Sequence, residues 1–149
     1  MPIILRNLLA LLIGIAVGGG VNMGLIVLGP SVIPPPAGVD VTNAESFRAA
    51  MHLFEPRHFV MPFAAHALGT LAGALAGCLL AASRETAISY GIGAVFLFGG
   101  VAASFMIPAP AWFVILDLVG AYIPMAWLGL TIGNRMKSGR AGAQPRRGA

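Results

Sequence analysis

The fold is decided by residues 58–82, which read HFVMPFAAHALGTLAGALAGCLLAA. After the opening histidine, the only side chain in this stretch that carries a charge near neutral pH is His66. A helix rises 1.5 Å per residue, so a stretch of this length is long enough to cross the roughly 30 Å hydrocarbon core of a bilayer. The stretch therefore predicts a membrane-spanning helix.

One face of this predicted helix consists of small residues. Gly69, Gly73 and Gly77 recur every four residues, which makes two overlapping GxxxG units. Such units let a second helix backbone approach closely in lipid. Pro62 and His66 fall on the same face, within about 60° of the glycines. We predict that these three glycines are helix-packing residues and that His66 points inward with them.

The composition extends the membrane assignment to the whole chain. Its 149 residues are 58% hydrophobic and 9% charged, and the mean hydropathy is +0.87. Soluble domains contain about 25% charged residues, so this chain is suited to lipid. The single cysteine, Cys78, excludes an intramolecular disulfide and a CxxC motif, and we expect it to be a packing residue. No basic patch is interleaved with aromatic residues, so we expect no nucleic-acid partner.

The pattern of apolar runs and turns predicts an all-α four-transmembrane-helix bundle. The expected spans are residues 3–29, 58–82, 87–107 and 111–134. The first apolar run is longer than the core of a signal peptide, which favours an uncleaved helix. Cleavage after the glycines at 18–20 is the alternative. The last span contains Pro124, which a membrane helix tolerates when neighbours satisfy the freed carbonyl group.

The first loop predicts a short amphipathic helix. The segment 29–36 (GPSVIPPP) cannot be helical at its three consecutive prolines. Thr42 and Glu45 then have the spacing of a capping box. We expect a helix at residues 43–54, lying on the bilayer surface or capping the bundle. Its apolar face would comprise Phe47, Ala50, Met51 and Phe54.

The distribution of basic residues predicts the orientation. If both termini are cytoplasmic, the inside holds seven basic residues: Arg6, Arg84, Arg135, Lys137, Arg140, Arg146 and Arg147. The outside then holds two, Arg48 and Arg57. The positive-inside rule favours this arrangement in a bacterial inner membrane, with the first loop outside. We interpret residues 137–149 as a disordered basic cytoplasmic tail.

Three polar residues lie within the predicted spans: Asn22, His66 and Asp117. Each lies roughly 9–12 Å below the outer surface and on the small-residue face of its helix. We therefore predict an intramembrane polar cluster. A lone carboxylate in lipid costs at least about 2.5–3.5 kcal/mol, and pairing with His66 would offset that cost for Asp117. Tyr122 is a further candidate for this cluster, but it lies on a different face of its helix from Asp117, where it would contact lipid instead.

A second group of polar residues comprises His52, Glu55 and His58. Their three-residue spacing differs from the H-E-x-x-H pattern, in which the two histidines share one zinc ion. We therefore expect no metal site and interpret Glu55, Arg57 and His58 as anchors at the membrane surface. No nucleophile elbow or phosphate-binding loop is present, and only His66 could ligate a haem at depth. We expect no catalytic residue and no cofactor.

Three segments carry a resemblance to a known family: VNMGLIVLGPSVIPPPAGVDV (21–41), MHLFEPRHFVMPFAAHALGTLAGALAG (51–77) and WFVILDLVGAYIPMAWLG (112–129). Together they resemble an uncharacterised family of small four-helix bacterial integral membrane proteins. The resemblance covers most of the chain except the basic tail. It implies the four-helix fold and implies no substrate or reaction.

These observations leave three functional hypotheses. The first is a structural or accessory membrane protein that contacts the lipid bilayer and forms a homo-oligomer or joins a larger membrane complex. The second is a small proton-linked transporter or channel that uses His66 and Asp117. The third is a membrane enzyme acting on a lipid or small molecule at the outer surface. Four closely packed helices leave little room for a pathway, which favours the first.

Overall fold

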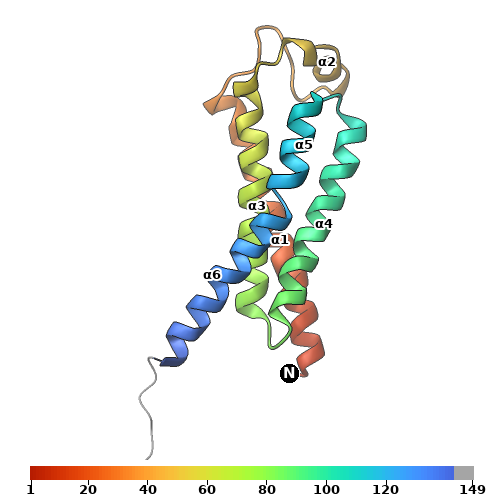
Figure 1. The fold of residues 1–149 in the computed structure, drawn as a ribbon. Coiled ribbons are helices and arrows are strands. Elements are labelled where there is room, and N and C mark those ends of the chain that lie inside the picture. Colours follow the sequence, from red (N-terminus) through yellow and green to blue (C-terminus); the bar gives the residue numbers. More distant parts are fainter. Residues whose placement is uncertain (143–149) are drawn as a thin grey trace, which may run out of the picture.

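The computed structural model describes residues 1–142 and is entirely helical in its regular structure (Figure 1). The helices are α1 (Ile3–Val32), α2 (Ala44–Ala49), α3 (Val60–Leu80), α4 (Glu85–Met106), α5 (Ala111–Gly120) and α6 (Ile123–Gly142), with 3₁₀ turns η1 (Met51–Leu53) and η2 (Pro56–Phe59). No strand occurs in the described part of the chain. The predicted all-α four-helix bundle is confirmed.

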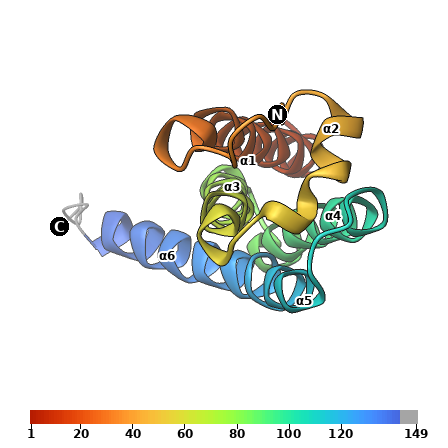
Figure 2. The same cartoon turned by 90° about the horizontal axis from the view of Figure 1, so that it is seen from above.

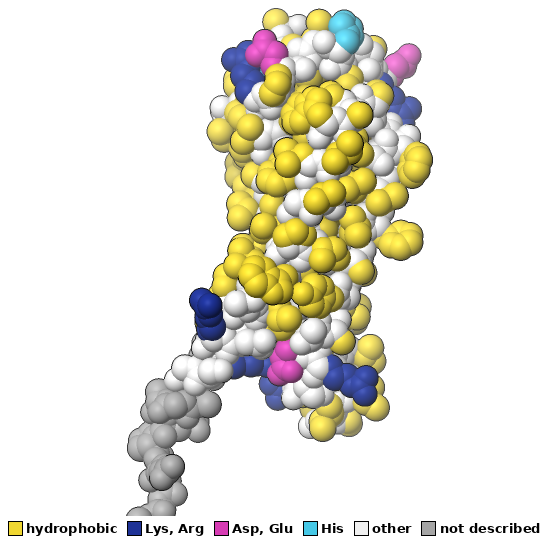
Figure 3. All heavy atoms as spheres, in the orientation of Figure 1, with side chains coloured by type: hydrophobic (Ala, Val, Ile, Leu, Met, Phe, Trp, Pro, Cys, Tyr) yellow, Lys and Arg dark blue, Asp and Glu magenta, His cyan; other side chains and the backbone are white. Residues whose placement is uncertain are grey.

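Four segments are long and apolar enough to cross a membrane: Ile3–Val32, Pro56–Leu80, Glu85–Met106 and Ala111–Gly139. The surface agrees with this assignment, because charged side chains gather near the two ends and hydrophobic side chains cover the face between them (Figure 3). We call the two ends the α2 end and the terminal end. The N-terminus and the last turn of α6 both lie at the terminal end (Figure 1).

Helix α3 lies at the centre of the bundle. It packs against α1 on one side and against α4 and α6 on others (Figure 2). In lipid, the surroundings are as apolar as the helix surfaces, so association depends on close packing of atoms. The position of α3 therefore depends on how closely its neighbours can approach.

Helices α1 and α3 approach through glycines on both sides. A Cβ atom added to Gly73 would lie 2.7 Å from the carbonyl oxygen of Gly14. One added to Gly69 would lie 2.9 Å from the carbonyl oxygen of Gly18. Since real Cβ atoms do not come this close, the two antiparallel backbones touch at a distance that only glycine permits.

The other neighbours of α3 also use small residues. A Cβ atom on Gly129 of α6 would lie 2.8 Å from the carbonyl oxygen of Leu71. One on Gly77 would lie 2.5 Å from the side chain of Ile92 in α4. Of the three predicted packing glycines, Gly69 and Gly73 therefore face α1, and Gly77 accommodates a side chain of α4. Cys78 is fully buried beside α6.

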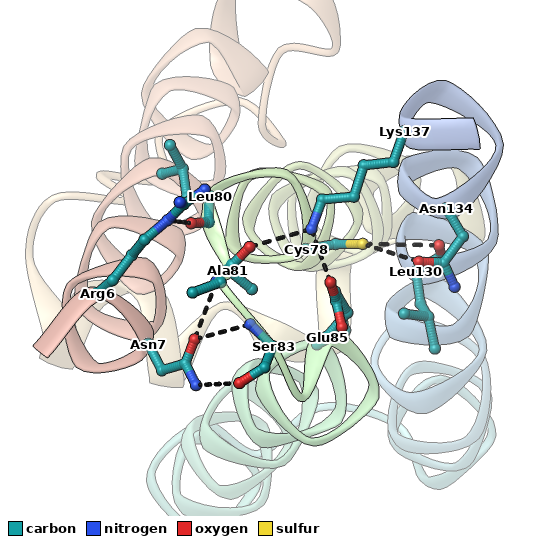
Figure 4. Close-up of polar contacts among 12 residues, drawn as sticks. Arg6, Asn7, Cys78, Leu80, Ala81, Ser83, Glu85, Leu130, Asn134 and Lys137 are labelled. Carbon is teal, nitrogen blue, oxygen red and sulfur yellow. Dashed lines mark hydrogen bonds and ion pairs between the residues drawn. The ribbon is translucent and has the colours of Figure 1, made fainter. Parts of the chain in front are cut away.

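At the terminal end, cations from both outer helices meet the C-terminus of α3 (Figure 4). Nε of Arg6 donates to the carbonyl oxygen of Leu80 at 3.0 Å. Nζ of Lys137 donates to that of Ala81 at 3.1 Å and to Glu85 at 2.9 Å. The last carbonyl groups of a helix lack intrahelical partners and carry partial negative charge, so cations stabilise them.

The turn between α3 and α4 is held by Asn7 of α1. Its Oδ1 accepts hydrogen bonds from the backbone N–H groups of Ala82 and Ser83, at 3.0 and 3.2 Å. Its Nδ2 donates to Oγ of Ser83 at 3.0 Å. The turn passes through Arg84 in the left-handed conformation, with φ of 58°. Helix α1 thus determines which face of α3 packs against it and also holds the turn between α3 and α4.

Two boundaries near the α2 end differ from the sequence expectation. Helix α1 continues through Pro30 to Val32, because a single proline removes one donor and the chain becomes non-helical only before the three prolines. Helix α2 is shorter than 43–54 and is capped by Asn43, whose side chain accepts from Glu45 N and Ser46 N. Thr42 instead donates to Asp40.

The fourth span also differs, because it is divided into α5 and α6. Pro124 has no N–H group for the carbonyl oxygen of Gly120, and its ring collides with that carbonyl in a continuous helix. The tail prediction is wrong for residues 137–142, which continue α6 where Lys137 pairs with Glu85. Residues 143–149 of that predicted tail lie outside the described residues.

We expect Gly73→Leu to lower the free energy of unfolding by about 3 kcal/mol, because its side chain would separate α3 from α1. Gly24→Leu is the matched control, since nothing lies within 4 Å of a Cβ atom there. Thermal unfolding in detergent measures both variants. Equal midpoints for Gly73→Leu and Gly24→Leu would contradict the close α1–α3 packing.

Candidate functional site

A cavity of about 310 Å³ lies at the α2 end of the bundle. Its walls come from α1, α3, α4 and α5, and α2 with the 3₁₀ turns runs across the end of the bundle (Figure 2). Most of the lining side chains are apolar, and the polar ones are few. Two of these are His66 of α3 and Asp117 of α5.

His66 and Asp117 form a direct pair. Nδ1 of His66 lies 2.9 Å from each carboxylate oxygen of Asp117. The carboxylate side chain is 7% exposed and the imidazole 22%. A buried carboxyl group requires hydrogen-bond partners, and the imidazole supplies one. The structure therefore brings together two of the three residues predicted for the intramembrane cluster.

Tyr122 is a third member of this cluster, and its predicted contact with lipid is wrong. The residue is 1% exposed, and its hydroxyl donates to Oδ2 of Asp117 at 2.8 Å. Its ring stacks on the imidazole of His66, with 5.8 Å between the centroids. Gly100 of α4 makes room for it, because a Cβ atom there would lie 2.6 Å from Cζ of the tyrosine.

The break in the fourth span explains how Tyr122 reaches Asp117. Two residues five positions apart point about 140° from each other on a continuous helix. Helix α5 ends at Gly120 and α6 begins at Ile123, so Tyr122 lies in the connection and is turned toward the carboxylate. Pro124 is the residue in the sequence that signals this change in helix direction, and the sequence prediction did not take its effect into account.

Asn22 does not join the cluster. It makes no hydrogen bond with His66 or Asp117 within residues 1–142. Its backbone and Cβ pack on Gly69, where an added Cβ atom would lie 2.9 Å from Cβ of Asn22. The depth of Asn22 along α1 follows from the sequence, but the direction of its side chain depends on the α1–α3 contact. The glycine face of α3 turns Asn22 into the helix interface.

Aromatic rings close the α2 end of the cavity. Phe59 and Phe113 pack with their centroids 4.7 Å apart, and Met51 is buried against them. Phe47 and Phe54 of the first loop also pack on this group. Their own two rings lie edge to face, with 5.4 Å between the centroids. The predicted surface helix therefore caps the bundle, which was one of its two expected positions. It covers the cavity with apolar side chains.

Between the cluster and the terminal end, the bundle is tightly packed. Side chains that are fully buried there include Thr70, Ala74, Ser89, Ile92 and Ala126. The hydroxyl groups of Thr70 and Ser89 donate to backbone carbonyl oxygens, those of His66 and Ala74. The cavity therefore reaches the polar cluster from the α2 end, and the packed layer lies beneath it.

The second predicted polar group does not converge on a common point. His52 Nδ1 lies 2.9 Å from the carbonyl oxygen of Ala49. Nδ1 of His58 accepts from the backbone N–H of Glu55 at 2.9 Å, while the Glu55 side chain pairs with Arg57 at 3.0 Å. Within the described chain, no three histidine, cysteine or acidic residues lie close enough to hold a metal ion.

Comparison with protein-family models, curated proteins and solved structures found no match to this chain. The resemblance to a family of small bacterial integral membrane proteins therefore stays a prediction. The functional argument depends on the geometry of the cavity and its polar cluster.

We expect His66→Ala and Asp117→Asn to be coupled, because removing either residue leaves the other without its partner. A double-mutant cycle in a detergent-stability assay should give a coupling energy of about 1 kcal/mol. His52→Ala is the control, since His52 is exposed and contacts only its own turn. Its effect should add to that of Asp117→Asn. A cycle without coupling between His66 and Asp117 would contradict the pair.

Proposed function

We propose that this protein is an accessory protein of the bacterial inner membrane that holds a small amphiphilic molecule in the cavity at its α2 end. The observation that carries this proposal is a cavity of about 310 Å³ with apolar walls and one polar cluster, at His66, Asp117 and Tyr122. Ligand sites have this character, with apolar walls and a few polar groups that fix the orientation of the ligand.

The route to the cavity supports a ligand that comes from the membrane. Near the terminal end, α1 and α4 pack together through Ala10, Leu11 and Ile92. Toward the α2 end, Ile26 of α1 and Ala103 of α4 both line the cavity. At this level of the bundle the outward faces of both helices are apolar and exposed, with Val27 on α1 and Phe105 on α4. A lipophilic molecule can enter between them without crossing water.

A proton-linked transporter or channel is the second candidate. It is favoured by the ionisable pair of His66 and Asp117, since such groups inside spans are costly and mark functional sites. A pathway would also have to pass the packed layer around Thr70 and Ile92. The glycine contacts between α1 and α3 would have to separate for this. Binding requires no such change, so it is the better-supported function.

The proposed topology places both termini in the cytoplasm and the α2 end outside. The start of α1, the α3–α4 turn and the last part of α6 lie at the terminal end (Figure 1) and carry Arg6, Arg84, Arg135 and Lys137. A cytoplasmic position for these residues satisfies the positive-inside rule. The cavity then opens to the outer half of the bilayer. The glycine-lined faces of α1 that remain uncovered would serve assembly with a second copy or a larger membrane complex.

We expect Ala103→Phe to abolish retention of the amphiphile, because the new ring would occupy the cavity. Ala102→Phe is the matched control, since Ala102 is exposed on the same helix and does not line the cavity. Lipid extraction of the purified protein, followed by mass spectrometry, measures retention. Identical extracts from wild type, Ala103→Phe and Ala102→Phe would rule out a ligand in this cavity.

Of two reporters fused to the C-terminus, only the one that works in the cytoplasm should be active, because seven basic residues would lie outside in the opposite orientation. Paired alkaline phosphatase and fluorescent-protein fusions measure this. A fusion after Gly38, in the first loop, is the control and should give the opposite signal. Periplasmic activity at the C-terminus would overturn the proposed orientation.

A further inference from the structure

One nitrogen of His66 is free to meet a ligand. The imidazole uses Nδ1 for its contact with Asp117, and Nε2 makes no hydrogen bond within the described residues. No buried side-chain nitrogen or oxygen in that part of the chain lacks a partner, so Nε2 is accessible rather than enclosed. His66 and Asp117 both line the cavity, and Nε2 is the side-chain polar atom of the pair that has no partner within the described residues, so it is the one offered to a bound molecule.

Asp117, by contrast, is already occupied. Its Oδ2 accepts the hydroxyl of Tyr122, and both oxygens lie 2.9 Å from Nδ1 of His66. Its side chain is 7% exposed. A ligand therefore meets the imidazole first, and Asp117 acts by holding the orientation of that ring.

Charge balance determines what Nε2 can do. In a buried apolar site, a cluster without net charge is favoured, because an uncompensated charge loses its hydration. Two protonation states of the His66–Asp117 pair have no net charge. One is an imidazolium beside a carboxylate, and the other is a neutral imidazole that accepts a hydrogen bond from a carboxylic acid. In the first, both ring nitrogens carry hydrogen. In the second, Nδ1 accepts, so the hydrogen lies on Nε2. Nε2 is a hydrogen-bond donor in both.

The same balance restricts the charge of the ligand. A carboxylate bound at Nε2 would give the buried cluster a net negative charge, and an ammonium group would meet a donor instead of an acceptor. A neutral molecule with an acceptor oxygen leaves the charge unchanged and satisfies Nε2. The surrounding walls, which include Ile26, Phe59 and Phe113, provide apolar contact for its remaining atoms.

We propose that the ligand is a neutral lipophile whose acceptor oxygen, such as a carbonyl oxygen, accepts a hydrogen bond from Nε2 of His66. This rests on the proposed binding function and specifies its chemical class. Tyr122 and Asp117 are positioning residues for the imidazole. The acceptor group lies at the inner end of the cavity and the apolar body extends between α1 and α4.

The test uses the full chain in lipid nanodiscs and four probes with matched chains: 2-dodecanone labelled with ¹³C at the carbonyl, dodecane, dodecanoate and dodecylamine. Infrared spectra should show a second, lower-frequency ¹³C carbonyl band that is absent from empty nanodiscs. The ketone should bind about tenfold more tightly than dodecane, the difference that one hydrogen bond makes. His66→Phe should abolish the band, and Phe98→Ala should keep it, because Phe98 is 81% exposed on the lipid face.

The wild-type protein alone also tests the proposal if His66→Phe does not fold. The ¹⁵N spectrum of ligand-free protein should show a protonated Nε2 at His66. An unprotonated Nε2, or tighter binding of dodecanoate or dodecylamine than of the ketone, would overturn the inference. If wild type retains the ketone, Ala103→Phe does not, and the lower-frequency carbonyl band is absent, the inferred hydrogen bond to Nε2 is overturned and the binding function stands. Failure to retain either the ketone or dodecane would overturn both.

Discussion

The contact on which this bundle depends is the meeting of two backbones at Gly14, Gly18, Gly69 and Gly73. In lipid, no hydrophobic driving force favours contact between apolar helices, so their association requires many short-range contacts. Glycines spaced every four residues on antiparallel helices provide such contacts along a whole face. Because α3 is held this closely, its remaining faces receive α4 and α6 at fixed positions. The order of the bundle and the direction of His66 both follow.

The polar cluster depends on that rigid frame. Asp117 is tolerated in an apolar environment because His66 and Tyr122 both reach it. His66 comes from α3, whose direction the glycines set, and Tyr122 comes from the connection between α5 and α6. Charge that would be costly in lipid is compensated within a few ångströms, and the cavity receives a single free donor in place of a charge.

Periodicity and composition predicted the fold well and the site in part. The four spans and the short helix of the first loop follow from apolar runs, prolines and turn residues, which are local signals; these signals left open whether that helix lies on the bilayer or caps the bundle. The pairing of His66 with Asp117 follows from the cost of an isolated carboxylate. Asn22 and Tyr122 were misplaced because their directions depend on events outside their own helices. The α1–α3 contact turns Asn22 aside, and Pro124 alters the course of the fourth span. No single-helix projection contains that information.

The division of the fourth span has a mechanical consequence. Helix α6 packs closely on α3 through Gly129 and Gly133, whereas the buried residues of α5 are Phe113 and Asp117. An outward displacement of α5 would separate Trp112 and Phe113 from Phe59, and Asp117 from His66. Proteins open locally at free energies well below that of complete unfolding. Exchange of a large molecule by this route would break these contacts and expose Asp117, while the packing of α6 on α3 at the terminal end would stay intact.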